Sequence, residues 1–195
     1  MLILSKKRII LMMCMICVSV YAFSFKIANN TAVAEKTVET VSTPVSNKVV
    51  IVDAGHGTPD EGAESSNGTT EAELNLKIAL KLQKLLEQSG CTVLLTRSDE
   101  NAIYDAGSDT IREKKVSDIH NRVKLGNESS ADIFVSIHLN KISQSQYSGW
   151  QTFYKTNNED SKRLATSIQN SLNEAMQKEN NRTPARLNTC LLYTS

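Results

Sequence analysis

From residue 48 onward the chain alternates between short apolar runs and segments whose apolar residues recur at helical spacing, and this alternation constrains the fold most. The pattern predicts strands at 49–53, 91–97, 132–140 and 149–155. It predicts helices at 71–89, near 116–128 and around 164–175. Strands separated by helices favour an α/β fold, with a mostly parallel central sheet flanked by helices on both sides.

Two of the three histidines follow predicted strands. His56 comes just after the first strand, and His138 closes the third. Because ligands bind beyond the carboxyl ends of strands in open α/β sheets, we expect these side chains to meet at one sheet edge. Gly55 and Gly57 leave room for a ligand to approach His56. His120 lies in a charged helical stretch and is expected at the surface.

A glutamate at the start of the first predicted helix offers a third metal ligand. Thr70 and Glu73 have the spacing of a capping box, which gives Glu73 a structural role. Glu71 occupies the first helical position, where the helix dipole alone would also favour a carboxylate. With His56 and His138 it forms a His₂Glu set, which is common in catalytic zinc sites and suits zinc better than calcium or magnesium.

Other ligand classes fit less well. The segment GHGTPDEG at 55–62 lacks the spacing of a dinucleotide or phosphate loop, and its proline and acidic residues do not suit an anion. The 22 Lys and Arg residues nearly balance 21 Asp and Glu residues, and the basic ones are scattered. No nucleic-acid partner is therefore expected.

The N-terminal segment has the composition of an export signal. A Lys-Lys-Arg triplet at 6–8 precedes the apolar run 9–25, and a small-x-small cleavage motif follows at 32–34. We interpret 1–34 as a signal peptide or a membrane anchor acting through 9–25, because the run is intermediate in length between the two. Residues 35–47, rich in Thr, Ser and Val, are expected to be a linker. The following domain is then extracytoplasmic, secreted or anchored at the cell envelope.

Three motifs in order resemble a known enzyme family. They are VDAGHGTPDEGA at 52–63, NGTTEAELNL at 67–76 and NRVKLGNESSADIFVSIHLN at 121–140. They resemble the zinc-dependent N-acetylmuramoyl-L-alanine amidases (amidase type 3), over roughly residues 48–178. The extended segment from 136 to 155, together with the export segment, is most similar to the germination-specific spore cortex branch of that family.

The resemblance implies a phosphorylase/hydrolase-like fold and a peptidoglycan substrate. In such enzymes the residues matching His56, Glu71 and His138 bind Zn²⁺. Zinc-activated water then cleaves the amide between N-acetylmuramic acid and the L-alanine of the stem peptide, in this branch during cortex maturation or germination. Arg97 and Arg122 match recurrent arginines and are interpreted as scaffold or wall-contact residues. The resemblance leaves any protein partner unknown.

The C-terminal part departs from the family pattern. The resemblance implies a second, proton-transferring glutamate on a late strand, yet the likeness fades after Arg182 and no glutamate follows Glu179. We therefore expect a catalytic domain at 48–185 that lacks its last strand, an atypical tail at 186–195, and no catalytic residue present besides the metal ligands. Glu61 and Glu64 are the loop carboxylates considered as substitutes.

Two other functions remain open from the sequence. A zinc-containing wall-binding module, or an impaired fragment, is consistent with the missing glutamate. A zinc peptidase acting on stem-peptide bonds is consistent with the same ligand set.

Overall fold

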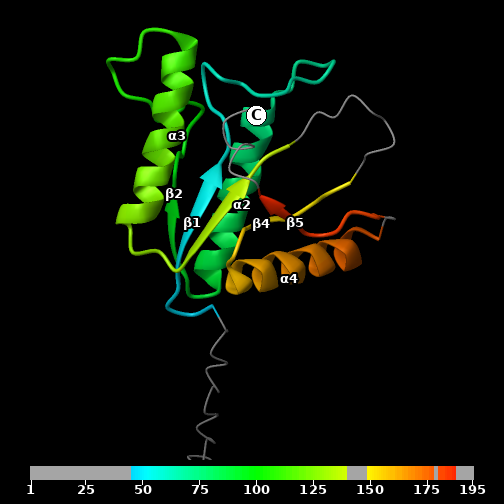
Figure 1. The fold of residues 1–195 in the computed structure, drawn as a ribbon. Helices are drawn as coiled ribbons and strands as arrows, with labels where there is room; N and C mark the ends of the chain where they lie inside the picture. Colours follow the sequence, from blue (N-terminus) through cyan, green and yellow to red (C-terminus); the bar gives the residue numbers. More distant parts are fainter. Residues whose placement is uncertain (1–44, 140–148, 178–179, 188–195) are drawn as a thin grey trace, which may run out of the picture. The chain divides into compact units, whose positions relative to one another are not determined.

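A computed structural model describes residues 45–139, 149–177 and 180–187 (Figure 1). The central sheet consists of three parallel strands in the order β2-β1-β3: β1 is Val49–Ala54, β2 is Thr92–Leu95 and β3 is Ile133–Ile137. In the register, Val50 pairs with Val93 on one side and with Ile133 on the other. The predicted parallel sheet is therefore confirmed.

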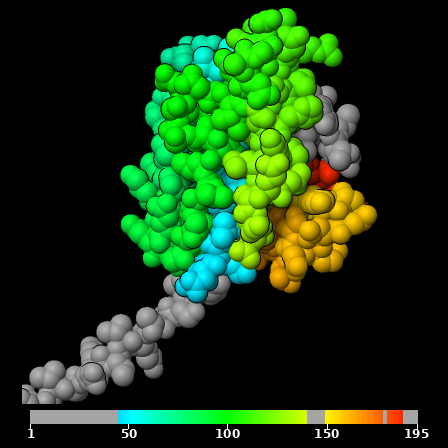
Figure 2. All heavy atoms as spheres, turned by 90° about the vertical axis from the view of Figure 1, so that its left-hand side faces the viewer, coloured from blue at the N-terminus to red at the C-terminus, as the bar shows by residue number. Residues whose placement is uncertain are grey.

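Two helices form the crossovers between these strands. Helix α2 (Glu71–Gln88) joins β1 to β2, and α3 (Ile111–Glu128) joins β2 to β3. They lie on opposite faces of the sheet, because Val52 of β1 packs with Ala79 of α2, whereas Asp53 of β1 pairs with Arg122 of α3 (Figure 1). Figure 2 views the molecule from the side on which α3 lies. This arrangement confirms that helices cover both faces of the central sheet.

Alternation along β1 divides its side chains between the two faces. Val50, Val52 and Ala54 join Ala79 of α2 and Cys91 in one buried apolar cluster. Ile51 and Asp53, which alternate with these residues, are also buried, and Asp53 pairs with Arg122 of α3. Both faces of β1 are covered, which explains why its sequence is almost continuously apolar.

A second, smaller sheet forms in the C-terminal part. Strand β4 (Phe153–Lys155) pairs in parallel with β5 (Ala185–Leu187), and α4 (Glu159–Met176) connects them. Strand β5 was not predicted from the sequence, and it reaches into the segment interpreted as an atypical tail, because Arg186 pairs with Tyr154. Beneath this pair the buried Gln169 accepts a hydrogen bond from the backbone N–H of Thr152 (2.8 Å) and donates to Arg182 O (3.3 Å).

The predicted signal or anchor segment, 1–34, lies outside the described residues, as does most of the predicted linker. Within the described ranges, no helix combines the length and apolar character needed to span a membrane.

Candidate metal site

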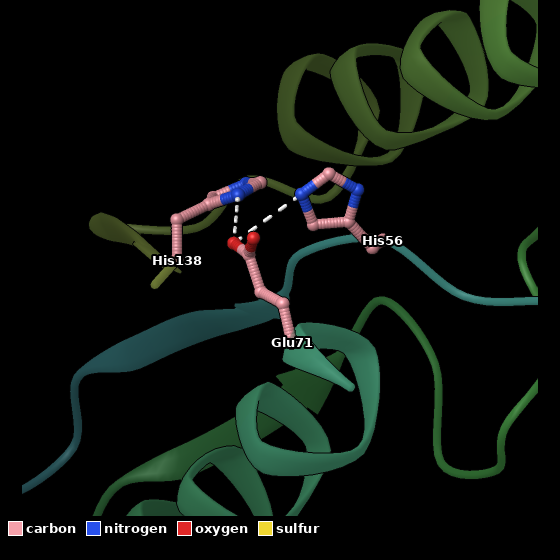
Figure 3. A group of neighbouring side chains, drawn as sticks. All are labelled: His56, Glu71 and His138. Atoms are coloured by element: carbon pink, nitrogen blue, oxygen red, sulfur yellow. Dashed lines mark hydrogen bonds and ion pairs between the residues drawn. The ribbon is translucent and has the colours of Figure 1, made fainter. Parts of the chain in front are cut away.

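The structure brings His56, Glu71 and His138 together at the carboxyl edge of the central sheet (Figure 3). Glu71 Oε1 lies 3.3 Å from His56 Nε2 and 3.2 Å from His138 Nδ1. The two imidazole rings meet edge to face, with centroids 4.9 Å apart. One potential ligand atom from each side chain lies within 4.8 Å of the others. Three segments far apart in sequence thus contribute to one cluster.

Backbone hydrogen bonds fix the Glu71 carboxylate. Oε1 accepts from the N–H of Leu139 (2.8 Å) and Oε2 from the N–H of Ala63 (3.2 Å). Burial by itself raises the pKa of Glu71, but hydrogen bonds from both histidines and these two amides hold its pKa well below the usual range. The site therefore contains a carboxylate that is ionised at neutral pH and fixed in position.

The His56 ring is held between two carboxylates. Its Nδ1 lies 3.2 Å from Asp60 Oδ2, and its Nε2 faces Glu71. Burial lowers the pKa of His56, but these two acidic neighbours outweigh it and raise the pKa to about 9 in the metal-free protein. A metal ion binding at Nε2 must therefore displace a proton.

Two glycines provide the space that the three side chains occupy. A Cβ built on Gly55 would lie 2.4 Å from the His138 ring, and one on Gly62 would lie 2.8 Å from His56 and 2.9 Å from Glu71 Oε2. Gly62 also has a φ of +68°, which favours glycine. His56 itself has a φ of 61°, so the loop around it is held in an unusual conformation.

Two buried arginines hold the backbone of that loop. Arg97 donates to the carbonyl oxygens of Ala54 (2.9 Å) and Gly55 (3.0 Å). Arg122 donates to Ala54 O (2.8 Å) and His56 O (2.7 Å). Both guanidinium groups are buried, so the structure supports the scaffold interpretation of these arginines and not contact with the wall.

Acidic partners compensate the charge of Arg122. Asp53 Oδ1 lies 2.6 Å from its Nη1, and Asp118 Oδ2 lies 2.8 Å from its Nε. Asp53 also accepts hydrogen bonds from Thr96, which follows β2 directly, and from Ser136 of β3. Sequence reasoning missed both aspartates. The only sequence feature that marked Asp53 was its position at the end of an apolar strand, and its partner Arg122 lies 69 residues away.

The other residues considered as site residues have structural partners. His120 is exposed and is not part of the cluster, as expected. The Glu61 carboxylate accepts from the hydroxyls of Thr58 (2.7 Å) and Thr70 (3.1 Å), and so braces the loop against α2. The backbone of Glu64 forms an isolated bridge with Thr70.

The predicted capping box at the start of α2 is half formed. The Thr70 side chain accepts from the backbone N–H of Glu73, but the Glu73 carboxylate pairs with Lys77. Thr70 still caps the helix whose first residue is Glu71.

A cavity of about 290 Å³ lies beside this start of α2. Its lining includes Thr58, Glu61, Thr70 and Arg97, and none of the three clustered side chains. The cavity therefore belongs to the supporting loop and not to the cluster itself.

The donor set fits a zinc ion. One ionised carboxylate and two imidazoles are ligands that zinc prefers. The side chains of His56 and Glu71 are only 7% and 6% exposed, whereas that of His138 is 38% exposed. The cluster is therefore closed on the His56 side and reachable from solvent beside His138.

Known proteins are similar to this chain over the segment that contains the three clustered residues. Residues 50–193 match the protein family described as N-acetylmuramoyl-L-alanine amidase, which extends the likeness beyond residue 178. The germination-specific N-acetylmuramoyl-L-alanine amidase of Bacillus subtilis (strain 168) is 34% identical over 131 residues, covering 67% of this chain and 55% of that protein. The amidase LytC of the same organism is 34% identical over 145 residues, covering 73% and 26%. The chain thus spans about half and about a quarter of the length of these relatives.

Solved structures show the same similarity. The CwlD amidase from Clostridioides difficile, solved in complex with the GerS lipoprotein, has a TM-score of 0.71 and 42% identity, covering 76% of this chain and 77% of that one. The catalytic domain of CwlV from Bacillus (Paenibacillus) polymyxa var. colistinus has a TM-score of 0.60 and 30% identity, covering 76% and 74%.

Proposed function

The chain belongs to the N-acetylmuramoyl-L-alanine amidase family, and from this premise we propose that it hydrolyses the amide bond between N-acetylmuramic acid and the L-alanine of the peptidoglycan stem peptide. We propose further that Zn²⁺, held by His56, Glu71 and His138, serves this reaction. The observation that carries the proposal is the meeting of these three side chains, with potential ligand atoms within 4.8 Å of one another.

Zinc in such a site supplies a Lewis acid that polarises the carbonyl and lowers the pKa of bound water to about 7. The chain's own residues supply the rest. Glu71 contributes the negative charge that two neutral imidazoles lack, and the amides of Leu139 and Ala63 keep its oxygens in place. The substrate carbonyl enters beside His138, where the cluster is exposed, while the buried His56 side excludes water.

Amide hydrolysis also requires a group that passes a proton to the leaving amine. We assign no such residue within the described ranges. Glu61, one of the two loop carboxylates considered, is occupied by hydrogen bonds from Thr58 and Thr70.

We propose an extracytoplasmic role in spore cortex maturation or germination. The similarity to the germination-specific amidase of Bacillus subtilis and to the CwlD amidase supports this role. Export through residues 1–34, followed by a linker to residue 47, is the organisation that this role requires. A lipoprotein partner, as in the solved CwlD complex, is a further proposal for this chain.

The metal proposal is tested by zinc content in four variants of the full chain. We expect His56→Ala, Glu71→Ala and His138→Ala each to lower the zinc bound per chain, measured after dialysis by atomic emission. His120→Ala is the control and should retain the wild-type content, because His120 is exposed and separate from the cluster. Equal zinc retention in all four variants would refute the site.

The reaction is tested by mass spectrometry of purified peptidoglycan after incubation with the zinc-loaded protein. An amidase produces muramic acid with a free lactyl carboxyl group and stem peptides that begin with L-alanine. A peptidase would shorten the stem and leave the lactyl group substituted. A wall-binding module would bind zinc and leave the muropeptides unchanged.

A further inference from the structure

We propose that Asp60 is a positioning residue, which orients the His56 ring so that Nε2, and not Nδ1, is the nitrogen presented to a metal ion. The inference rests on the proposed zinc site and concerns a side chain that does not itself join the three-residue cluster. It is carried by the hydrogen bond between Asp60 and His56 and by the contacts that fix Asp60.

The two nitrogens of His56 face different carboxylates. Nδ1 lies 3.2 Å from Asp60 Oδ2, and Nε2 lies 3.3 Å from Glu71 Oε1. An ionised carboxylate can only accept hydrogen bonds, so the nitrogen facing Asp60 must carry a hydrogen. Nε2 faces the ionised Glu71 and also carries a hydrogen in the metal-free protein. A metal beside Glu71 displaces that hydrogen, while the hydrogen bond to Asp60 keeps the one on Nδ1, so Nε2 supplies the lone pair to the metal. A carboxylate behind a histidine is a recurrent way of fixing the ring and raising its basicity as a ligand.

Asp60 is itself held in place, unlike a mobile surface carboxylate. Its backbone exchanges two hydrogen bonds with Gly57, of 3.0 Å and 2.8 Å. Its Oδ1 accepts from the N–H of Gly62 (3.4 Å), and its Oδ2 lies 3.4 Å from Lys115 Nζ on α3. The Asp60 side chain is only 27% exposed. These contacts anchor the loop that follows His56 and fix the direction from which the hydrogen bond is accepted.

The test measures zinc affinity of the full chain by competition with a chromophoric chelator. We expect Asp60→Ala to weaken zinc binding by about 10- to 100-fold, the usual effect of removing a residue that supports a metal ligand. Asp60→Asn keeps the shape and one acceptor oxygen, so its loss should be smaller. Asp132→Asn is the matched control: Asp132 also pairs with a lysine, Lys48, but precedes β3 at the opposite end from His138. Its zinc affinity should be unchanged.

A second measurement separates ring orientation from a general loosening of the loop. In the zinc-loaded wild type, NMR of ¹⁵N-histidine-labelled protein should show a slowly exchanging proton on His56 Nδ1. This resonance should exchange rapidly with water in Asp60→Ala. Thermal unfolding of the metal-free variants checks that each one is folded.

Three outcomes would overturn the inference. If Asp60→Ala binds zinc within twofold of wild type, Asp60 does not support the ligand and the zinc site itself still stands. If affinity falls but the Nδ1 proton stays protected, the effect is not orientation of the ring. If the wild type binds no zinc, the proposed function and this inference fail together.

Discussion

Gly55 leaves room for the His138 ring because glycine has no Cβ. A Cβ at Gly55 would lie 2.4 Å from both Cε1 and Nε2 of the His138 ring, closer than real contacts allow, so Gly55→Ala must move the ring or the loop. We expect zinc affinity to fall by about tenfold or more, equivalent to ~1.4 kcal/mol. Gly107→Ala is the control, because a Cβ there meets nothing within 4 Å. Wild-type zinc affinity in Gly55→Ala would show that the ring position does not matter for binding.

The ion pair between Asp53 and Arg122 makes the free energy of unfolding depend on pH in the acid range. Burial raises the pKa of Asp53, but the charge of Arg122 and hydrogen bonds from Ser136 and Thr96 outweigh it, so the pKa lies below the ordinary 3.8. At a pH between the pKa of Asp53 in the folded protein and its pKa in the unfolded chain, only the unfolded chain binds the proton. The stabilisation by Asp53 is therefore complete above pH ~4 and is lost as the pH falls further.

Asp53→Asn tests this dependence in urea unfolding of the metal-free protein. Removing one partner of a buried pair costs about 3–5 kcal/mol at neutral pH. The difference in unfolding free energy between wild type and variant should shrink below pH 4, by at most about 1.4 kcal/mol per pH unit. A difference that stays constant from pH 6 to pH 2.5 would contradict a lowered pKa at Asp53.

The sequence predicted the members of the cluster but not the residues that support them. His56, Glu71 and His138 could be recognised because each stands at the end of a strand or the start of a helix, and that position follows from the hydrophobic pattern alone. The roles of Asp60 and Asp118 depend on side-chain direction and on contacts across the fold. A single sequence contains no local signal for such contacts.

At the scale of elements, the two crossover helices begin with the same cap, and one of them presents a site residue. Thr70 caps α2 and Thr110 caps α3, with nearly identical backbone angles. We expect Thr70→Ala and Thr110→Ala each to lower the unfolding free energy of the metal-free protein by about 1 kcal/mol. Only Thr70→Ala should also weaken zinc binding, roughly threefold or more, because Glu71 follows that cap directly.

Thr70→Ser tests whether a hydroxyl at the cap is enough to restore stability and zinc affinity. Thr70→Ser keeps the hydroxyl that accepts from Glu73 N and donates to Glu61, so stability and zinc affinity should both return towards wild type. An equal loss of zinc affinity in Thr110→Ala would mean that general stability, and not the cap of α2, controls the metal site.

Element boundaries were predicted less well where polar residues dominate. Helix α3 begins at Ile111, five residues before the predicted start, because a complete capping box between Thr110 and Glu113 begins it within a charged stretch. Strand β4 is shorter than predicted, and β5 was missed because three residues are too few for an alternating pattern. The long apolar strands β1 and β3 were placed within a few residues.

At the scale of the whole molecule, a metal ion in this site would link three segments from different parts of the chain. It would connect the loop after β1, the first turn of α2 and the end of β3. Because the unfolded chain does not hold these ligands together, zinc should stabilise the folded state. At a free zinc concentration 100 times the dissociation constant, the expected gain is about 2.7 kcal/mol. For a domain of this size, that corresponds to a rise of about 5–10 °C in the unfolding midpoint.

Differential scanning calorimetry with and without zinc tests this linkage, and hydrogen exchange locates it. Protection should increase at the amides of Ala63 and Leu139, which already donate to Glu71, and not in α4. Magnesium at the same concentration should leave the midpoint unchanged, because it prefers oxygen ligands. Glu71→Ala should abolish the zinc-dependent shift, and His120→Ala should keep it. A shift of the same size in Glu71→Ala would place the stabilising ion elsewhere on the molecule and remove the physical basis for zinc chemistry at this sheet edge.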